Sequence, residues 1–288
     1  MAGLSIEARG ILWMLAAAFL FSAGDTLVKS ATQLFPTIEI VWARLAFHFL
    51  IMILLINRRL LAVSVSRAPV LQLVRSALLA LATVLLTLGL RVMPVADLTA
   101  VMFVTPLFVS ILSISLLGER FEARRWASVA VGLTGALVIL RPGFGMLQSA
   151  NVFLPIAASG CYALYQICTR KAGAVDAAMT SLLWTPVVGF VVLSFIVHPD
   201  WVAPDVSGWG LLAAIGTLSG ISQYCLIRAV HAAPASVVAP YLYSGLIWAT
   251  VFGYMLFGDF PDIWTFIGAG LIVASGLFIL YRGRSVIA

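Results

Sequence analysis

Charge is the property this sequence has least of. Asp, Glu, Lys and Arg make up 10% of the 288 residues, and 62% are hydrophobic. A soluble domain carries about 25% charged residues, so a water-facing surface cannot be built from this composition. The mean hydropathy of +1.11 agrees with that reading. The sequence also lacks a Walker loop, which argues against an ATP-driven pump.

Cysteine and histidine are equally scarce. Cys161, Cys168 and Cys225 fall inside hydrophobic segments, and an odd number of such residues predicts free thiols rather than a disulfide framework. The three histidines lie far apart without metal-ligand spacing. No grouping of residues suits catalysis. We therefore predict no cofactor, no metal site and no enzymatic activity.

Long hydrophobic runs fill the sequence instead. A membrane-spanning helix needs roughly 20 apolar residues, and lipid cannot satisfy an exposed backbone, so each run is predicted to be helical. We predict an all-α integral membrane protein with ten transmembrane helices. The first run contains Asp25 and Lys29, and we interpret it as a retained span rather than a cleaved signal. The spans are expected at 10–31, 37–56, 70–91, 95–117, 125–140, 150–170, 179–197, 208–230, 235–257 and 263–281.

The basic residues are distributed unequally between the two sets of loops. Of the 17 Lys and Arg residues, only Lys29, Arg91 and Arg141 fall on one side, and Arg44 lies within a span. The positive-inside rule then places both termini in the cytoplasm. The net charge of +6 is explained by topology, and no nucleic-acid partner is expected. The other side carries Arg9, Arg58, Arg59, Arg67, Arg75, Arg120, Arg124, Arg125, Arg170, Lys171, Arg228, Arg282 and Arg284.

The two halves of the chain repeat each other. Pro94 and Pro234 match at an offset of 140 residues, and Lys29 matches Arg170 at an offset of 141. These registers predict two domains of five helices, at 10–141 and 150–282. Because five is odd, the second copy must be inverted relative to the first. Inverted repeats are a common transporter architecture, with the binding site near the middle of the membrane between the halves.

One motif of proline, small residues, Gly-Glu or Gly-Asp and a glycine-rich last helix occurs in both halves. Its residues are Pro94, Ala96, Ala100, Pro106, Gly118, Glu119, Gly132 and Gly135, and then Pro234, Ser236, Pro240, Gly258, Asp259, Gly270 and Gly276. This motif resembles the EamA family of the drug/metabolite transporter superfamily over nearly the full length. The resemblance implies ten helices, two EamA repeats, a central cavity and alternating access. It also implies transport of amino acids, amino-acid-derived metallophores, vitamins, nucleotide-like metabolites or drugs.

Two pairs of opposite charges lie at matching depths in the first two spans. Asp25 is ~9 Å below the outer end of the first span and Arg44 ~10 Å below that of the second, at 1.5 Å per residue. Lys29 and Glu39 match at about 3 Å. Charges inside a membrane require partners and often mark function, so we predict that Asp25 pairs with Arg44. The shallower pair of Lys29 and Glu39 is interpreted as an anchor at the membrane interface. Substrate contact by Asp25 and Arg44 remains an alternative, since the Arg44 fork suits a carboxylate.

Further candidates for a substrate cavity lie on the second, sixth and ninth spans. His48 follows Arg44 by one turn, and either a neutral, hydrogen-bonded histidine or a proton-coupling group suits that position. Tyr165 and Gln166 lie on the sixth span, where Gln166 is the repeat equivalent of Asp25. Tyr241, Ser244 and Trp248 share one face if their helix is continuous, and packing is the alternative to a cavity wall.

The favoured function is secondary active transport by alternating access, with export of a small organic metabolite such as an amino acid, an amino-acid derivative or a drug-like solute. Uptake of a vitamin or cofactor-like metabolite is the alternative within this class. An intramembrane enzyme or a non-transporting membrane subunit is the alternative outside it. The expected partners are a small-molecule substrate, the lipid bilayer and a coupling proton. The expected location is the bacterial inner membrane.

Overall fold

All regular secondary structure in the described part of the chain is helical. The computed structural model describes residues 6–56, 60–117, 123–140, 153–233 and 235–283. Gly118, Glu119, Pro234, Arg141 and the 141–152 linker lie outside these ranges. The first half contains α1 (Ile6–Ala31), α2 (Thr37–Ile56), α3 (Leu60–Ser64), α4 (Pro69–Val92), α5 (Val95–Met102), α6 (Thr105–Leu117) and α7 (Ala123–Leu140).

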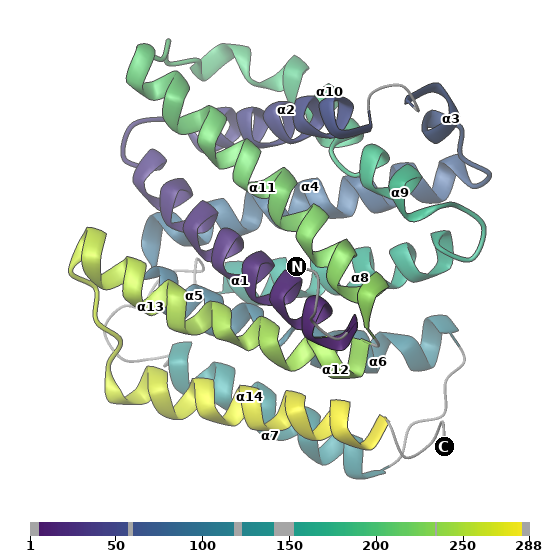
Figure 1. Ribbon diagram of the computed structural model, residues 1–288. Helices are drawn as coiled ribbons and strands as arrows, with labels where there is room; N and C mark the ends of the chain where they lie inside the picture. The colour runs from purple at the N-terminus through teal and green to yellow at the C-terminus, as the bar shows by residue number, and fades with distance from the viewer. Residues whose placement is uncertain (1–5, 57–59, 118–122, 141–152, 234, 284–288) are drawn as a thin grey trace.

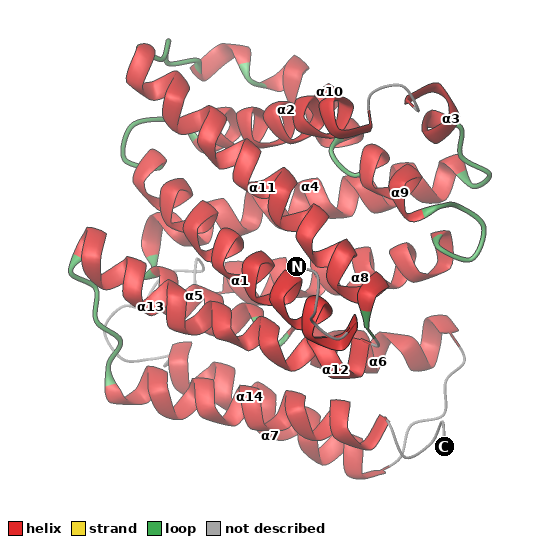
Figure 2. Cartoon of the chain, viewed as in Figure 1, coloured by secondary structure: helices red, strands yellow, loops and turns green. Residues whose placement is uncertain are grey.

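The second half follows the same order, and Figures 1 and 2 show both halves as one bundle of roughly aligned helices. It contains α8 (Leu154–Ala172), α9 (Ala178–Trp184), α10 (Val187–Ile196), η3 (His198–Asp200), α11 (Val206–Ala232), α12 (Ala235–Val238), η4 (Ala239–Tyr243), α13 (Ser244–Phe257) and α14 (Ile263–Gly283). The expected all-α membrane fold is confirmed, and the short α3 is an addition that the sequence analysis did not anticipate.

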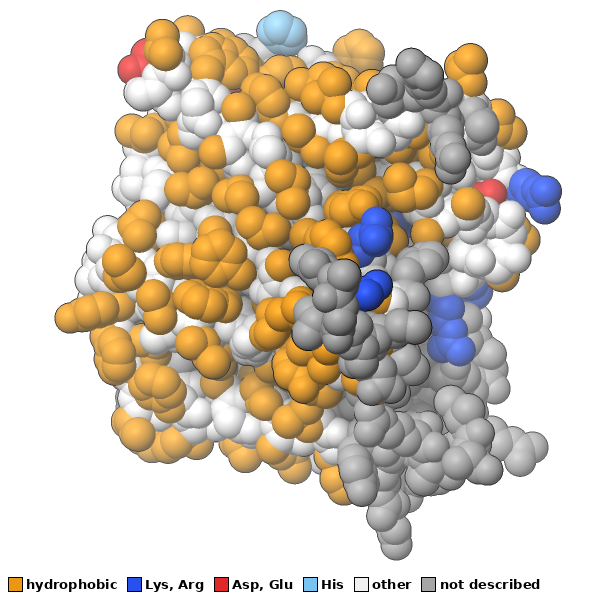
Figure 3. Space-filling model, viewed as in Figure 1, with side chains coloured by type: hydrophobic (Ala, Val, Ile, Leu, Met, Phe, Trp, Pro, Cys, Tyr) orange, Lys and Arg blue, Asp and Glu red, His pale blue; other side chains and the backbone are white. Residues whose placement is uncertain are grey.

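The outer surface of the bundle suits lipid. Within the described residues, five segments are long and apolar enough to cross a membrane, namely Ala8–Ala31, Thr37–Ile56, Pro69–Val92, Ala178–Ile196 and Val206–Ala229. Leu54, Phe195 and Met255 each expose more than half of their surface. In Figure 3, hydrophobic side chains cover most of the visible described face, and the visible Lys and Arg gather toward the side of α3 and α9. We call this side the α3 end.

Three of the predicted spans are interrupted rather than continuous. Pro106 is the second residue of α6, Pro186 separates α9 from α10, and Pro240 lies in the 3-10 turn η4 between α12 and α13. Proline has no N–H to donate and clashes with the preceding turn, so helices break beside it. Interrupted helices at membrane depth are tolerated where neighbouring helices satisfy the freed backbone groups.

The packing of the helices follows the inverted repeat. α1 packs along α11, and its repeat equivalent α8 packs along α4. The end of α1 lies at the end of α4, where Arg91 Nη2 donates to the Thr32 carbonyl at 3.2 Å. The end of α8 lies near the start of α4, where Arg75 Nε donates to Thr169 Oγ1 at 2.7 Å. The first helices of the two repeats therefore run in opposite directions.

The last helices of the two repeats, α7 and α14, pack against each other through glycine. A Cβ at Gly135 would lie 2.6 Å from the Gly268 carbonyl oxygen, and one at Gly268 would lie 2.5 Å from the Gly135 carbonyl oxygen. These distances leave no room for a side chain. Gly132 is equally crowded, because a Cβ there would lie 2.1 Å from Leu107 Cδ1 of α6. Gly270 differs, because nothing lies within 4 Å of a Cβ there.

Candidate functional site

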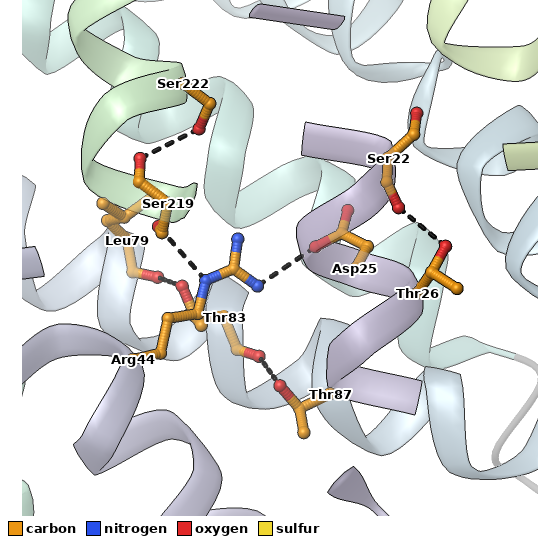
Figure 4. Close-up of polar contacts among 9 residues, drawn as sticks. All are labelled: Ser22, Asp25, Thr26, Arg44, Leu79, Thr83, Thr87, Ser219 and Ser222. Carbon is orange, nitrogen blue, oxygen red and sulfur yellow. Dashed lines mark hydrogen bonds and ion pairs between the residues drawn. The ribbon is translucent and has the colours of Figure 1, made fainter. Parts of the chain in front are cut away.

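An ion pair lies deep between three helices. Arg44 Nη1 of α2 donates to Asp25 Oδ1 of α1 at 3.1 Å, and Arg44 Nε donates to Ser219 Oγ of α11 at 3.3 Å. Figure 4 shows the guanidinium pointing between Asp25 and Ser219. The predicted pairing of Asp25 with Arg44 is confirmed. It joins the first repeat to α11 of the second, so it lies between the halves.

Polar side chains surround this pair, and each uses its own helix for a hydrogen bond. Thr83 and Thr87 of α4 donate to the carbonyls of Leu79 and Thr83, at 2.8 and 2.9 Å (Figure 4). Ser222 of α11 donates to the Ser219 carbonyl at 2.9 Å. Thr26 of α1 donates to the Ser22 carbonyl at 2.7 Å. Hydroxyls bonded in this way keep lone pairs available to a ligand.

The hydrogen-bonding capacity of the pair is only partly used. Arginine carries five N–H donors. Among the described residues, Arg44 uses one donor for Asp25 and one for Ser219. The side chains of Arg44 and Asp25 remain 12% and 16% exposed, so the pair is not sealed. Nη2 of Arg44 and the second oxygen of Asp25 are therefore available to a further group.

His48 lies one helical turn beyond Arg44 and is 1% exposed. Its Nε2 is buried without a partner among the described residues. The hydrogen-bonded histidine considered from the sequence is thus not satisfied at this nitrogen. A small ligand group hydrogen-bonded to Nε2 would remove the deficit.

The residues of α8 that correspond to the Asp25 region of α1 lie in two different environments. Tyr165 is 7% exposed, stacks on Tyr162 with 5.4 Å between ring centroids, and accepts from Arg75 rather than from Arg44. Tyr162 lies within electrostatic reach of both Asp25 and Arg44. Gln166 is exposed, unlike Asp25, its repeat equivalent. Of these residues, Tyr162 is therefore the one nearest to the ion pair.

The structure does not place Tyr241, Ser244 and Trp248 on one regular helical face. The 3-10 turn η4 ends at Tyr243 and changes the spacing between Tyr241 and the rest. Ser244 donates to the Tyr241 carbonyl at 2.7 Å, and Tyr241 is 39% exposed. Trp248 packs edge-on against Phe19 of α1, with centroids 5.0 Å apart. The Gly245 carbonyl, next to Ser244, accepts from Ser22 Oγ of α1 at 2.8 Å, which links the start of α13 to the helix that carries Asp25. The three residues remain candidates.

The second pair matched by depth, Lys29 with Glu39, does not form. Lys29 Nζ pairs with Asp259 at 2.5 Å, beyond the end of α13, and also lies over the Phe257 ring. Glu39 instead accepts from the Val202 backbone N–H at 3.0 Å. Counting residues along a helix fixes the depth of a side chain but not the direction in which it points. Lys29 and Glu39 match in depth but face different neighbours.

A second buried arginine, Arg75, was assigned from the sequence to a loop. It lies inside α4, is 2% exposed, and uses all five donors. Nε donates to Thr169 and Nη2 to Tyr165 and Thr185, at 2.7, 3.1 and 2.7 Å. Nη1 donates to Gln72 Oε1 and to the Ser181 carbonyl, at 2.8 and 2.7 Å. Among the described residues, no carboxylate lies within ion-pair distance.

Asp176, in the loop between α8 and α9, extends this cluster. It accepts from Gln72 Nε2 at 2.8 Å, from Ser66 Oγ at 2.5 Å and from the Arg67 backbone N–H at 2.7 Å. Burial alone would raise the pKa of the Asp176 carboxyl, but these hydrogen bonds outweigh it and hold the pKa below its ordinary value of 3.8. The loop of the second repeat is thereby tied to the start of α4.

One signal in the sequence could have identified Arg75. It is the sixth residue of the predicted 70–91 span, within the run LQLVRSALL. A base at that position cannot reach a loop without distorting the helix, so it requires partners inside the bundle. Its partners Thr169, Ser181 and Thr185 are common residues without a motif, and the sequence alone does not indicate them.

Other chemistry is limited in the described part of the chain. No group of three or more metal-ligating side chains occurs among the described residues. The three cysteines are free, as predicted. A surface hollow of about 400 Å³ lies at the end of the bundle opposite α3 and is separate from the Asp25 network. Its lining residues are Thr32, Gln33, Leu34, Phe35, Pro36, Arg91 and Asp200.

Related proteins align with this chain over nearly its whole length. The S-adenosylmethionine uptake transporter of Rickettsia prowazekii (strain Madrid E) is 28% identical, over 96% of this chain and 94% of the relative. The Pseudopaline exporter CntI of Pseudomonas aeruginosa (strain UCBPP-PA14) is 30% identical, over 94% and 96%. The Riboflavin transporter of Rhizobium johnstonii (strain DSM 114642 / LMG 32736 / 3841) is 28% identical, over 94% and 90%.

The fold is also found in a solved structure. A crystal structure with a TM-score of 0.66 and 19% sequence identity matches 98% of this chain and 99% of its own. The related proteins are named as transporters, which confirms that the chain is a transporter and not an enzyme. The sequence matches the EamA-like transporter family at residues 8–141 and again at 149–281. The chain therefore belongs to the EamA-like transporter family of multi-pass membrane proteins.

Proposed function

We propose that the chain is a secondary active transporter that exports a small organic metabolite carrying a carboxylate. The observation that carries this proposal is the difference between the two buried arginines. Arg75 has all five donors occupied, whereas Arg44 has bonds from two. An unsaturated guanidinium at membrane depth is expensive unless a ligand completes it.

The geometry of the pair favours a zwitterion such as an amino-acid group. A carboxylate can accept from the free edge of the Arg44 guanidinium, for which a planar fork is well matched. An ammonium group can donate to the second oxygen of Asp25. Ser219, which bonds Arg44 Nε, holds the guanidinium in place. His48, Tyr162 and the hydroxyls of Thr83 and Ser222 would surround the rest of the solute.

The transport cycle would be driven by a proton or substrate gradient and proceed by rocking of the inverted repeats around this pair. The excess of bases on one set of loops supports a cytoplasmic location for both termini in a bacterial inner membrane. Tyr241, Ser244 and Trp248 are proposed to contribute to the wall on the side of α13.

A transport assay in proteoliposomes tests the proposal. S-adenosylmethionine, riboflavin, an opine-type metallophore and neutral amino acids would be offered with and without a pH gradient. We expect flux of one or more carboxylate-bearing compounds, and none of their carboxamide or ester analogues. Equal flux of a compound and its carboxamide would contradict the role of Arg44.

Uptake of a cofactor-like metabolite is the second candidate, because a relative covering 96% of this chain is named for S-adenosylmethionine uptake. Direction is decided by measuring net flux in intact cells, with a substrate identified in proteoliposomes. Accumulation inside the cells would favour uptake, and faster loss of preloaded substrate would favour export.

A further inference from the structure

The interface between the repeats occurs twice, once at each end of the bundle. The residues of the two copies can be matched by the offsets of the repeat. At the α3 end, Ser76 Oγ of α4 donates to the Thr185 carbonyl at 2.8 Å. At the other end, a Cβ on Gly216 of α11 would lie 2.9 Å from the Arg44 carbonyl. Gly216 follows Ser76 by 140 residues, and Thr185 follows Arg44 by 141, the two offsets of the repeat. The register of the two interfaces is thereby fixed.

The two copies of this interface have opposite chemistry. With the same offsets, Arg75 corresponds to Ile215, Gln72 to Leu212, and Thr169 and Ser181 to Val28 and Ile40. These four equivalents are each 0% exposed and belong to one hydrophobic cluster. The end away from α3 is therefore closed by a dry apolar core. The α3 end is closed by hydrogen bonds that converge on one arginine.

The helix that Arg75 holds is short. α9 has seven residues and is cut off from α10 by Pro186. Arg75 Nη1 bonds the Ser181 carbonyl of α9, and Nη2 bonds Thr185 at its end. Asp176 anchors the loop that precedes α9. Gln72 and Ser76 of α4 add hydrogen bonds to Ser181 Oγ and to the Thr185 carbonyl, so a polar cluster centred on Arg75 holds this face of α9. A half-helix held in this way can move away as a unit when those contacts are released.

We propose that Arg75 is a positioning residue of the transport cycle: it latches α9 against α4 and α8, and its release opens the α3 end. This inference rests on the proposed transport function. In the closed state, the hydrogen bonds of Arg75 offset the desolvation of its charge. In the open state, water replaces those bonds and hydrates the guanidinium. The two states are thus close in free energy, as alternating access requires.

Sidedness of thiol labelling tests the latch without any substrate. Cys161, Cys168 and Cys225 are replaced by Ala, and Thr83→Cys is introduced as the reporter. Thr83 lies two turns beyond Arg75 on α4 and is 8% exposed beside Arg44 (Figure 4). A membrane-impermeant maleimide is applied from each side of the membrane. Single cysteines at Val65 and Val206, which are 73% and 91% exposed, identify the two ends.

Arg75→Leu is expected to raise the labelling rate of the reporter from the α3 end at least threefold and to lower it from the other end. Arg75→Lys, which keeps the charge, is expected to restore part of the parent behaviour. Ile215→Ala, at the repeat equivalent, is expected to raise labelling from the opposite end instead. Lys171→Leu, at an exposed position in the last turn of α8, is the charge control at the α3 end and is expected to change neither rate.

A latch predicts that the labelling rate rises from one end and falls from the other. A merely structural residue does not, because general loosening of the protein would raise the labelling rates from both ends. A folded Arg75→Leu protein with unchanged rates, or with both rates raised, would overturn the proposal. If that variant yields no folded protein, Arg75→Met decides by the same criteria. Labelling that shifts as expected in a protein without measurable flux would support the latch while counting against the proposed transport function.

Discussion

At the scale of single residues, two buried arginines solve the same problem in different ways. Arg75 is saturated by neutral oxygens from α4, α8 and α9, and no ligand is needed to complete it. Arg44 is paired with Asp25 and retains free donors. Burial alone does not distinguish a structural arginine from one that binds a ligand. The number of its N–H donors already bonded within the protein distinguishes them.

The Arg44 pair yields a prediction about stability. Arg44→Ala leaves the Asp25 carboxylate in a mostly buried site without its partner, which should lower the free energy of unfolding by about 3 kcal/mol. Replacing both residues, as Asp25→Asn with Arg44→Gln, removes the unpaired charge and should recover most of that loss. Thermal unfolding of the purified variants in detergent measures both effects.

The stabilities of the single and double variants show whether Asp25 and Arg44 interact. If the loss of stability in the double variant equals the sum of the losses measured for Asp25→Asn and for Arg44→Gln alone, the two side chains do not interact in the folded protein. Lys171→Met is a control for loss of a basic side chain, because Lys171 is exposed in the last turn of α8. That change should alter the free energy of unfolding by no more than about 0.5 kcal/mol.

The sequence predicted the Asp25–Arg44 pair because two opposite charges at equal depth in adjacent helices have few other partners. The same reasoning failed for Lys29 and Glu39, whose partners Asp259 and Val202 come from segments more than 150 residues away. Depth along a helix is readable from a sequence, whereas the rotation of a helix about its axis depends on packing against all its neighbours.

At the scale of elements, proline determines where spans are divided. The ten predicted spans correspond to helices in the structure, but the sequence analysis treated those containing Pro106, Pro186 and Pro240 as continuous. At Pro186, the Ser76 hydroxyl donates to the Thr185 carbonyl and accepts from the Val188 N–H at 2.9 Å. A neighbouring helix thus satisfies the break, and such a partner is not visible in a single sequence.

The loop before α9 should show a pH-dependent stability that depends on Asp176. The folded-state pKa of this carboxyl lies below its ordinary value of 3.8, so its stabilising effect is present above that value and is lost as the pH falls through the folded pKa. Asp176→Asn should lower the melting temperature at pH 7 and flatten the decline of stability below about pH 4.

Melting curves of the parent and of Asp176→Asn between pH 3 and pH 7, recorded by nano-calorimetry, measure this difference. Asp200→Asn serves as the control, because Asp200 is exposed in η3 at the other end of the bundle. Parallel curves for the parent and Asp176→Asn over the whole range would show that the carboxylate contributes nothing to the folded state.

Helix packing between α7 and α14 gives a third prediction. Gly268→Ala would place a methyl group 2.5 Å from the Gly135 carbonyl oxygen, so the helices must separate. Overpacking of this kind typically costs about 1–3 kcal/mol. Gly270→Ala, two residues away with open space, should be neutral or slightly stabilising because Ala favours the helix. Equal melting temperatures for the two variants would argue against this close contact.

At the scale of the whole molecule, the repeat offset predicted the inverted architecture, because helix order and odd helix number leave one arrangement for the copies. The asymmetry between the copies was not predictable. It depends on which residues of α4 face α8 and α9, and on their equivalents at the other end. Ile215 and Arg75 occupy matching positions in the repeat, but one is apolar and the other charged, so the repeat predicts where they lie and not how they differ.

Asp25 and Arg44 are the proposed substrate site of the transporter. The most direct test compares flux by the parent and by the folded Asp25→Asn/Arg44→Gln protein in matched proteoliposomes, using a carboxylate-bearing substrate that the parent transports. The account predicts that the double variant retains its fold, with a melting temperature near that of the parent, and loses at least 90% of the flux, on the order of a tenfold change or 1.4 kcal/mol. Unchanged flux in the double variant would contradict it.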